Sequence, residues 1–213
     1  MSFDLIAFTE ELTRVFNLVS SRFDKVVVTG SAALVFLIQH HPLFSDRVQE
    51  HLDSIGYSSY SDKSKPNDID MIIVQNTDFT ETKIGDYVSE QSICVSKTFV
   101  FHNKSTDKCQ INFDLIKMSK CKYIELNGIN IIHPMMLLTH YRENYRDTDL
   151  YKLRFLQNYE DCFESIDSEI FKIKKRQSTM IYHSDSETDA YFGSDYASES
   201  GSSSNMNICK KLF

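Results

Sequence analysis

The stretch PNDIDMIIV, residues 66–74, determines the fold that we predict for the whole chain. Two aspartates open a run of apolar, β-prone side chains, which indicates a strand. Alternate strand residues share a face, so Asp68 and Asp70 should project together. Neighbouring carboxylates repel each other and are costly to desolvate. A divalent cation between them removes both costs, and Mg²⁺ favours small carboxylate sites of this kind. The alternative is a strand that begins at a solvated, Asp-rich turn.

Two further segments carry matching polar groups. A run of three valines before Gly30 predicts a strand, and the apolar residues 32–38 after Ser31 predict a buried helix. A strand, a Gly-Ser turn and a helix N-terminus present free backbone N–H groups and a hydroxyl to a phosphate. Residues 109–116 alternate between polar and apolar side chains, which places Asp114 on the polar face of another strand. Asp114 is therefore the third candidate carboxylate.

Together these motifs resemble the nucleotidyltransferase superfamily of the DNA polymerase beta type. The resemblance runs through residues 25–116, and residues 133–160 are similar to the helical region of minimal and abortive-infection-type members. It implies an α+β fold, in which a mixed β-sheet nucleotidyltransferase core with flanking helices is followed by a C-terminal helical segment. One departure is the step of 37 residues from Ser31 to Asp68, which is longer than in most small members. We interpret residues 40–66 as an insertion.

The resemblance also implies the roles of individual residues. Asp68, Asp70 and Asp114 would be catalytic and would hold two Mg²⁺ ions, with Mn²⁺ as an alternative. Such ion pairs clamp the attacking and leaving oxygens of an in-line displacement. Gly30 would let the backbone approach a bound nucleotide, and Ser31 would donate a hydrogen bond to its β- or γ-phosphate.

The expected activity is transfer of a nucleoside monophosphate from an NTP to an acceptor hydroxyl, with release of pyrophosphate. The acceptor would belong to a protein, a small molecule or an RNA end. The alternative is a catalytically inactive, nucleotidyltransferase-like interaction module. Arg142, Arg146 and Lys152 would either contact the nucleotide phosphates or form structural ion pairs with Asp147 or Asp149.

Composition limits the remaining classes of function. The net charge of −7 argues against extended DNA binding. We expect no secretory signal, because no basic segment is followed by an apolar one. We also expect no membrane association, because the longest apolar stretch is too short to span a bilayer. The five cysteines are scattered and lack a Cys-x-x-Cys pair, which favours an intracellular, cytoplasmic protein with reduced thiols. A Gly-Lys-Ser or Gly-Lys-Thr phosphate loop is also missing, which argues against a P-loop kinase or ATPase.

The predicted organisation has three parts. They are the nucleotidyltransferase core at residues 1–132, the helical segment at 133–176 and an acidic, Ser-rich tail at 177–213. The tail has too few apolar residues to form a core, so we expect it to be disordered. Other elements follow from local patterns: a helix over 3–23 capped by Ser2, a helix over 79–96, a strand at 98–101, a hairpin over 122–132 that turns at Asn127-Gly128, and helices over 134–163 broken near Arg146.

Overall fold

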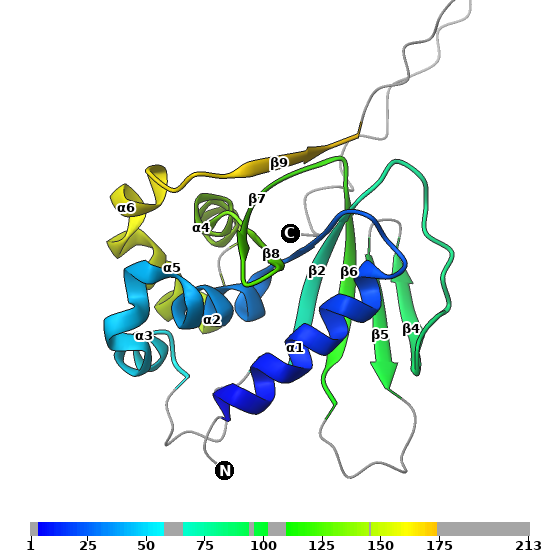
Figure 1. The fold of residues 1–213 in the computed structure, drawn as a ribbon, viewed down its shortest axis with the longest axis horizontal. Coiled ribbons are helices and arrows are strands. Elements are labelled where there is room, and N and C mark those ends of the chain that lie inside the picture. Colours follow the sequence, from blue (N-terminus) through cyan, green and yellow to red (C-terminus); the bar gives the residue numbers. More distant parts are fainter. Residues whose placement is uncertain (1–3, 58–65, 94–95, 102–109, 145, 174–213) are drawn as a thin grey trace, which may run out of the picture. The chain divides into compact units, whose positions relative to one another are not determined.

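The computed structural model describes residues 4–57, 66–93, 96–101, 110–144 and 146–173. The tail predicted at 177–213 lies outside these residues. Residues Met1–Ile173 form one compact unit, which has helices on a mixed β-sheet (Figure 1). The predicted α+β class with a mixed sheet is therefore confirmed.

The sheet has nine strands among the described residues, in the order β3-β4-β5-β6-β2-β1-β8-β7-β9. In chain order the strands are β1 (Val26–Val28), β2 (Asp68–Val74), β3 (Lys83–Ile84), β4 (Tyr87–Ile93), β5 (Ser96–Phe101), β6 (Asn112–Met118), β7 (Lys120–Leu126), β8 (Ile129–Ile132) and β9 (Glu169–Lys172). The central strand β2 runs antiparallel to β1 and parallel to β6. The predicted Asp-x-Asp strand thus lies in the middle of the sheet.

Two N-terminal helices pack on these central strands. The first is α1 (Leu5–Ser20), which lies across β2 and β6 in Figure 1. Its N-cap is Asp4, whose side chain accepts a hydrogen bond from the backbone of Ala7, so the predicted cap at Ser2 is wrong. The second is α2 (Gly30–His40), which follows β1 after a single residue and is buried throughout its middle, as its apolar sequence predicts.

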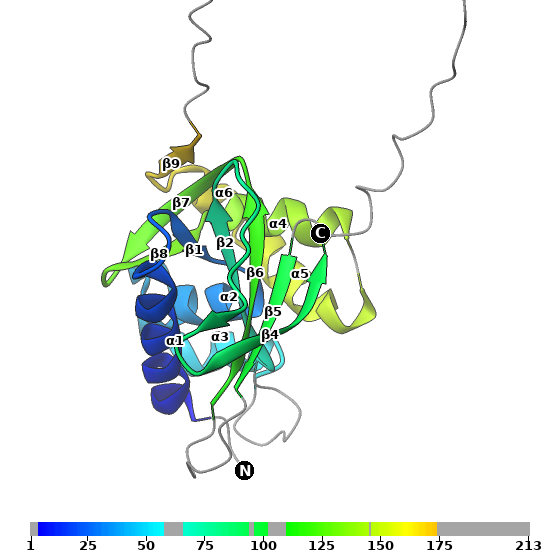
Figure 2. The same cartoon turned by 90° about the vertical axis from the view of Figure 1, so that its right-hand side faces the viewer.

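The remaining helices pack against α2 and against one another. They are η1 (Pro42–Arg47), α3 (Val48–Ser54), α4 (Pro134–Glu143), η2 (Asp147–Asp149), α5 (Leu150–Asn158) and α6 (Glu160–Glu164). Of these, α4 and α5 lie on the other side of β2 and β6 from α1 in Figure 2. Phe44 of η1 joins the insertion to the C-terminal helices. Its ring centroid lies 5.4 Å from that of Phe155, 5.0 Å from that of Tyr159 and 6.3 Å from that of Phe163. The break predicted near Arg146 lies between α4 and α5.

The helix predicted over 79–96 is wrong, because this segment forms β3 and β4. Gly85, with φ of +58°, reverses the chain between the two strands. Tyr87 is fully buried, and its ring packs against Phe101 and Phe113. The hydroxyl of Tyr87 also donates a hydrogen bond to Glu11 of α1. β-prone residues therefore complete the sheet beneath α1 instead of forming another helix.

Among the described residues, no helix is long and apolar enough to cross a membrane.

Candidate metal and phosphate site

Three carboxylates converge at the start of β2 and β6. Asp70 of β2 lies directly beside Asp114 of β6 in the parallel register, and Asp68 lies beside Asn112. One oxygen from each of Asp68, Asp70 and Asp114 lies within 4.8 Å of the others. The neighbouring alternate residues Ile69, Met71, Phe113 and Leu115 belong to the core and are fully buried. The two-residue period of the strands thus places all three predicted acids on one face.

Burial and mutual repulsion make this cluster costly when it is ionised. Burial, together with the charges of Asp68 and Asp114, raises the pKa of Asp70 from 3.8 to about 7. Burial and the charge of Asp68 also raise the pKa of Asp114, against a hydrogen bond from Thr98 that lowers it. A cation would bind favourably here, because a positive charge stabilises each of the ionised carboxylates, which otherwise repel one another.

The residues present fit a hard divalent cation. Oδ1 of Asp114 is buried and has no hydrogen-bond partner within the described part of the chain. Buried polar atoms without a partner are rare in folded proteins, so this oxygen is available to a ligand. Three carboxylate oxygens in one small cluster match the donor preference of Mg²⁺ and Mn²⁺. Asp68, Asp70 and Asp114 are therefore the residues that would hold such ions.

Gly30 fits closely against the carboxylate cluster. Its φ is +63°, a conformation that L side chains rarely adopt. A Cβ atom on Gly30 would overlap Oδ2 of Asp70. The backbone N–H of Thr29, one residue earlier, donates to the backbone carbonyl of Asp70 at 2.8 Å. A glycine is thus required where the N-terminus of α2 meets the acids.

Ser31, the second residue of the Gly-Ser pair, lies under a cationic side chain from α5. Nζ of Lys152 donates to Oγ of Ser31 at 2.7 Å and to Oδ1 of Asp149 at 3.0 Å. Nε of Arg146 donates to the other oxygen of Asp149 at 2.6 Å. The predicted ion pairs with Asp149 are therefore present, and Asp149 holds both cations at the site. Lys152 and Arg146 also lower the pKa of Asp70 through their charge.

Two tyrosines complete the surroundings of Ser31. Tyr57, from the insertion, and Tyr141, from α4, are both buried, and the Ser31 side chain acts to lower the pKa of each of them. Burial raises the pKa of Tyr57 to about 12 and raises that of Tyr141 as well, so both stay neutral. Sequence patterns gave no indication of either residue. Lys152 was predicted from the sequence either to contact phosphates or to form an ion pair with Asp147 or Asp149, but not to meet Ser31.

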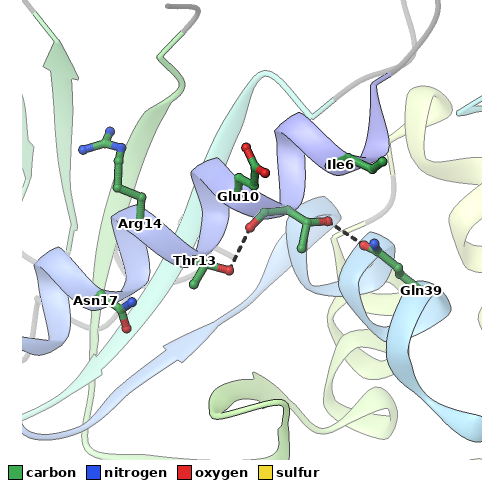
Figure 3. Close-up of a pocket in the computed structure, with 7 residues that line it drawn as sticks. Ile6, Glu10, Thr13, Arg14, Asn17 and Gln39 are labelled. Atoms are coloured by element: carbon green, nitrogen blue, oxygen red, sulfur yellow. Dashed lines mark hydrogen bonds between the residues drawn. The ribbon is translucent and has the colours of Figure 1, made fainter.

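Other candidate positions lie apart from this cluster. Arg142 forms an ion pair with Glu160 at the surface, not with the residues around Ser31. A cavity of about 430 Å³ lies on α1 and is lined in part by Glu10, Arg14 and Gln39 (Figure 3). It lacks a cluster of acids, and Arg14 is already bound to Glu11. Within the described ranges, only the aspartate cluster groups three side chains of the metal-binding types.

Comparison with known proteins adds little to this geometry. No protein-family model matches the chain, and no curated protein matches its sequence. Among solved structures, it is similar to the crystal structure of JHP933 from Helicobacter pylori, with a TM-score of 0.46 and 12% sequence identity. The match covers 76% of this chain and 70% of that chain. A similarity this distant carries no information about activity, so the functional argument depends on the site itself.

Proposed function

We propose that the chain is a metal-dependent nucleotidyltransferase that moves a nucleoside monophosphate from an NTP to an acceptor hydroxyl. The observation that carries this proposal is the meeting of two kinds of group in one place. Asp68, Asp70 and Asp114 would hold divalent cations, and the pair Ser31 and Lys152 lies at the adjoining N-terminus of α2. Phosphoryl and nucleotidyl transfer require Mg²⁺ bound by carboxylates next to groups that bind phosphate.

The chain's own residues would divide the work between binding and proton transfer. Lys152 would exchange the Ser31 hydroxyl for an oxygen of the β- or γ-phosphate, while Asp149 keeps the ammonium group in place. Ser31 and the first N–H groups of α2 would donate to the same phosphate. Arg146 is largely exposed at the edge of the cluster and would add positive charge near the leaving group.

The reaction joins the acceptor oxygen to the α-phosphorus and breaks the bond from that phosphorus to the oxygen bridging to the β-phosphate. The pyrophosphate leaves with that bridging oxygen. The acceptor hydroxyl loses its proton, which the carboxylate of Asp114 would accept. Bound divalent ions would lower the pKa of the acceptor hydroxyl and neutralise charge on the phosphates.

Radiolabelled nucleotides provide a direct test. The protein is incubated with Mg²⁺ and each of the four NTPs, labelled either at the α- or at the γ-phosphate, in the presence of protein or RNA acceptors. We expect label to be transferred from the α-position only, and transfer to be lost in Asp70→Asn. The exposed residue Asp161 provides a control, because Asp161→Asn should keep full activity. Transfer from the γ-position would instead show a kinase, and transfer that survives Asp70→Asn would refute the assigned site.

A thermal-shift titration with the same NTPs identifies the donor nucleotide. We expect a Mg²⁺-dependent rise in Tm with at least one NTP in the wild-type protein. If no NTP raises the Tm with or without Mg²⁺, the result favours the inactive interaction module.

A further inference from the structure

Thr98 of β5 lies next to the candidate metal site, but it is not part of the Gly-Ser turn, the Asp-x-Asp strand or the Asp114 strand. It is the direct neighbour of Asp114 in the antiparallel register between β5 and β6. Directly paired strand residues have Cβ atoms about 4.5–5.5 Å apart and meet on the same face. The side chain of Thr98 is also one of the groups that lower the pKa of Asp114. A neutral donor on an adjacent strand therefore lies beside the acid that completes the cluster.

We propose that Thr98 is a positioning residue, which orients the Asp114 carboxylate so that its free oxygen Oδ1 is directed at a divalent cation. This inference rests on the proposed function, in which Asp114 holds a metal ion. The carboxylate has two oxygens, and its Oδ1 is buried without a partner in the described part of the chain. The same carboxylate supplies a ligand atom within 4.8 Å of those from Asp68 and Asp70.

The chemistry of threonine suits this task. Its β-branched side chain has few accessible χ1 rotamers, so the direction of its hydroxyl is well defined. A hydrogen bond to one carboxylate oxygen fixes the side-chain rotation of Asp114 and leaves the second oxygen available. Loss of a partner that orients a metal ligand in this way typically lowers the affinity for the metal by about 10- to 100-fold.

The core on the opposite face keeps Thr98 and Asp114 together. Phe99 and Phe113 are the next pair in the same register, and both are fully buried. Their rings stack with centroids 4.9 Å apart and planes 8° from parallel. A shift of one residue between β5 and β6 would break this stack and turn Thr98 to the other face. The stack therefore specifies the pairing that the metal site uses.

The test measures binding of Mn²⁺ itself, by water-proton relaxation, to the full chain and to three variants. Thr98→Val keeps the shape and removes the hydroxyl, and we expect it to raise the Kd for Mn²⁺ by about 10- to 100-fold. Thr98→Ser keeps the hydroxyl and should bind close to the wild-type value. Ser96 lies on the same face of β5, two residues away and opposite Ile116, so Ser96→Ala serves as the matched control with unchanged affinity.

Urea midpoints measured without metal show whether Thr98 acts on the orientation of Asp114 or on the stability of the fold. A structural role would move the midpoint of Thr98→Val and leave the Kd of its folded fraction unchanged, which would overturn the proposal. It would also be overturned if Thr98→Ser lost as much affinity as Thr98→Val. If the valine variant fails to fold, Thr98→Ala replaces it with the same expected result. Failure of the wild-type protein to bind Mn²⁺ would refute the metal site, and with it the proposed function; wild-type binding with no effect at Thr98 refutes this inference alone.

Discussion

Replacing Asp70 by asparagine should stabilise the metal-free protein while it removes the cation site. Burial, followed by the charges of Asp68 and Asp114, raises the pKa of Asp70 from 3.8 to about 7. Each pKa unit corresponds to about 1.36 kcal/mol, so an ionised Asp70 costs the folded state about 4 kcal/mol. Asparagine has nearly the same shape but no charge. Because its amide must also leave water, we expect about half of this energy, about 2 kcal/mol, to be recovered.

The pH dependence gives this prediction its sign. A carboxyl whose pKa is higher in the folded than in the unfolded state makes the folded state bind more protons between the two values. The stability of the metal-free wild-type protein should therefore fall as the pH rises from about 4 to about 7, the window set by the two pKa values of Asp70. Asp114, whose pKa is also raised, adds to the loss in the same direction. Asp70→Asn should show a shallower fall.

Urea denaturation at pH 5 and pH 8, in EDTA and in excess Mg²⁺, provides the measurement. In EDTA, Asp70→Asn should exceed the wild type by about 2 kcal/mol at pH 8, and by close to zero at pH 5. Mg²⁺ should stabilise the wild-type protein and leave the variant unchanged, since ligands that bind only the folded state raise its stability. The exposed Asp161→Asn should behave as the wild type under all four conditions. An Asp70→Asn variant less stable than the wild type at pH 8 in EDTA would refute the argument, because Asp70 would then be a structural anchor.

Four further substitutions test the site and the elements around it. Gly30→Ala should lower the free energy of unfolding by about 2–3 kcal/mol, because its methyl group would meet a carboxylate at a strained φ. Gly56→Ala has a positive φ but open space, so it should lose only about 1 kcal/mol, and equal urea midpoints for both glycine variants would contradict the predicted clash. Asp149→Ala should lose about 3 kcal/mol in the same assay because it leaves Lys152 partly buried without its carboxylate partner; a loss below about 1 kcal/mol would show that this pair is well solvated. Phe44→Ala should lose about 3–5 kcal/mol and speed proteolysis near residues 40–57, and unchanged protease resistance would contradict its role as the link to the C-terminal helices.

The central part of the fold could be predicted because its local patterns agree with its tertiary environment. The strand at Asp68–Val74 alternates at its start and is continuously apolar where both faces are covered. The turn at Asn127-Gly128 joins β7 to β8, as that dipeptide predicts. The shared face of Asp68 and Asp70 follows from the two-residue period, whereas Asp114 joins them through the parallel register of β2 and β6. The sequence therefore located the acids before any tertiary contact was known.

The rest depended on contacts between distant parts of the chain. Ser31 and Lys152 are 121 residues apart, and no local pattern indicates that they meet. The prediction of a helix over 79–96 did not take the turn at Gly85 into account. The β-prone residues of this segment form a strand because β5 pairs with them. The four residues of β9 form a strand for the same reason, since they pair with β7. Short strands of this kind are specified by their neighbours more than by their own sequence.

The return of the chain to β7 has a mechanical consequence for the helices that carry Lys152. β8 leads into α4, and β9 follows α6, and both strands pair with β7. Tyr123 of β7 reinforces the second attachment, because its ring stacks on Phe171 at 4.1 Å and its hydroxyl donates to Glu169. The helical segment is thus tethered at both ends to one strand, and it cannot swing as a hinged lobe unless the β7–β9 ladder breaks. Under the proposed function, a nucleotide should accordingly bind through side-chain rearrangement at Lys152, without a movement of the helical segment.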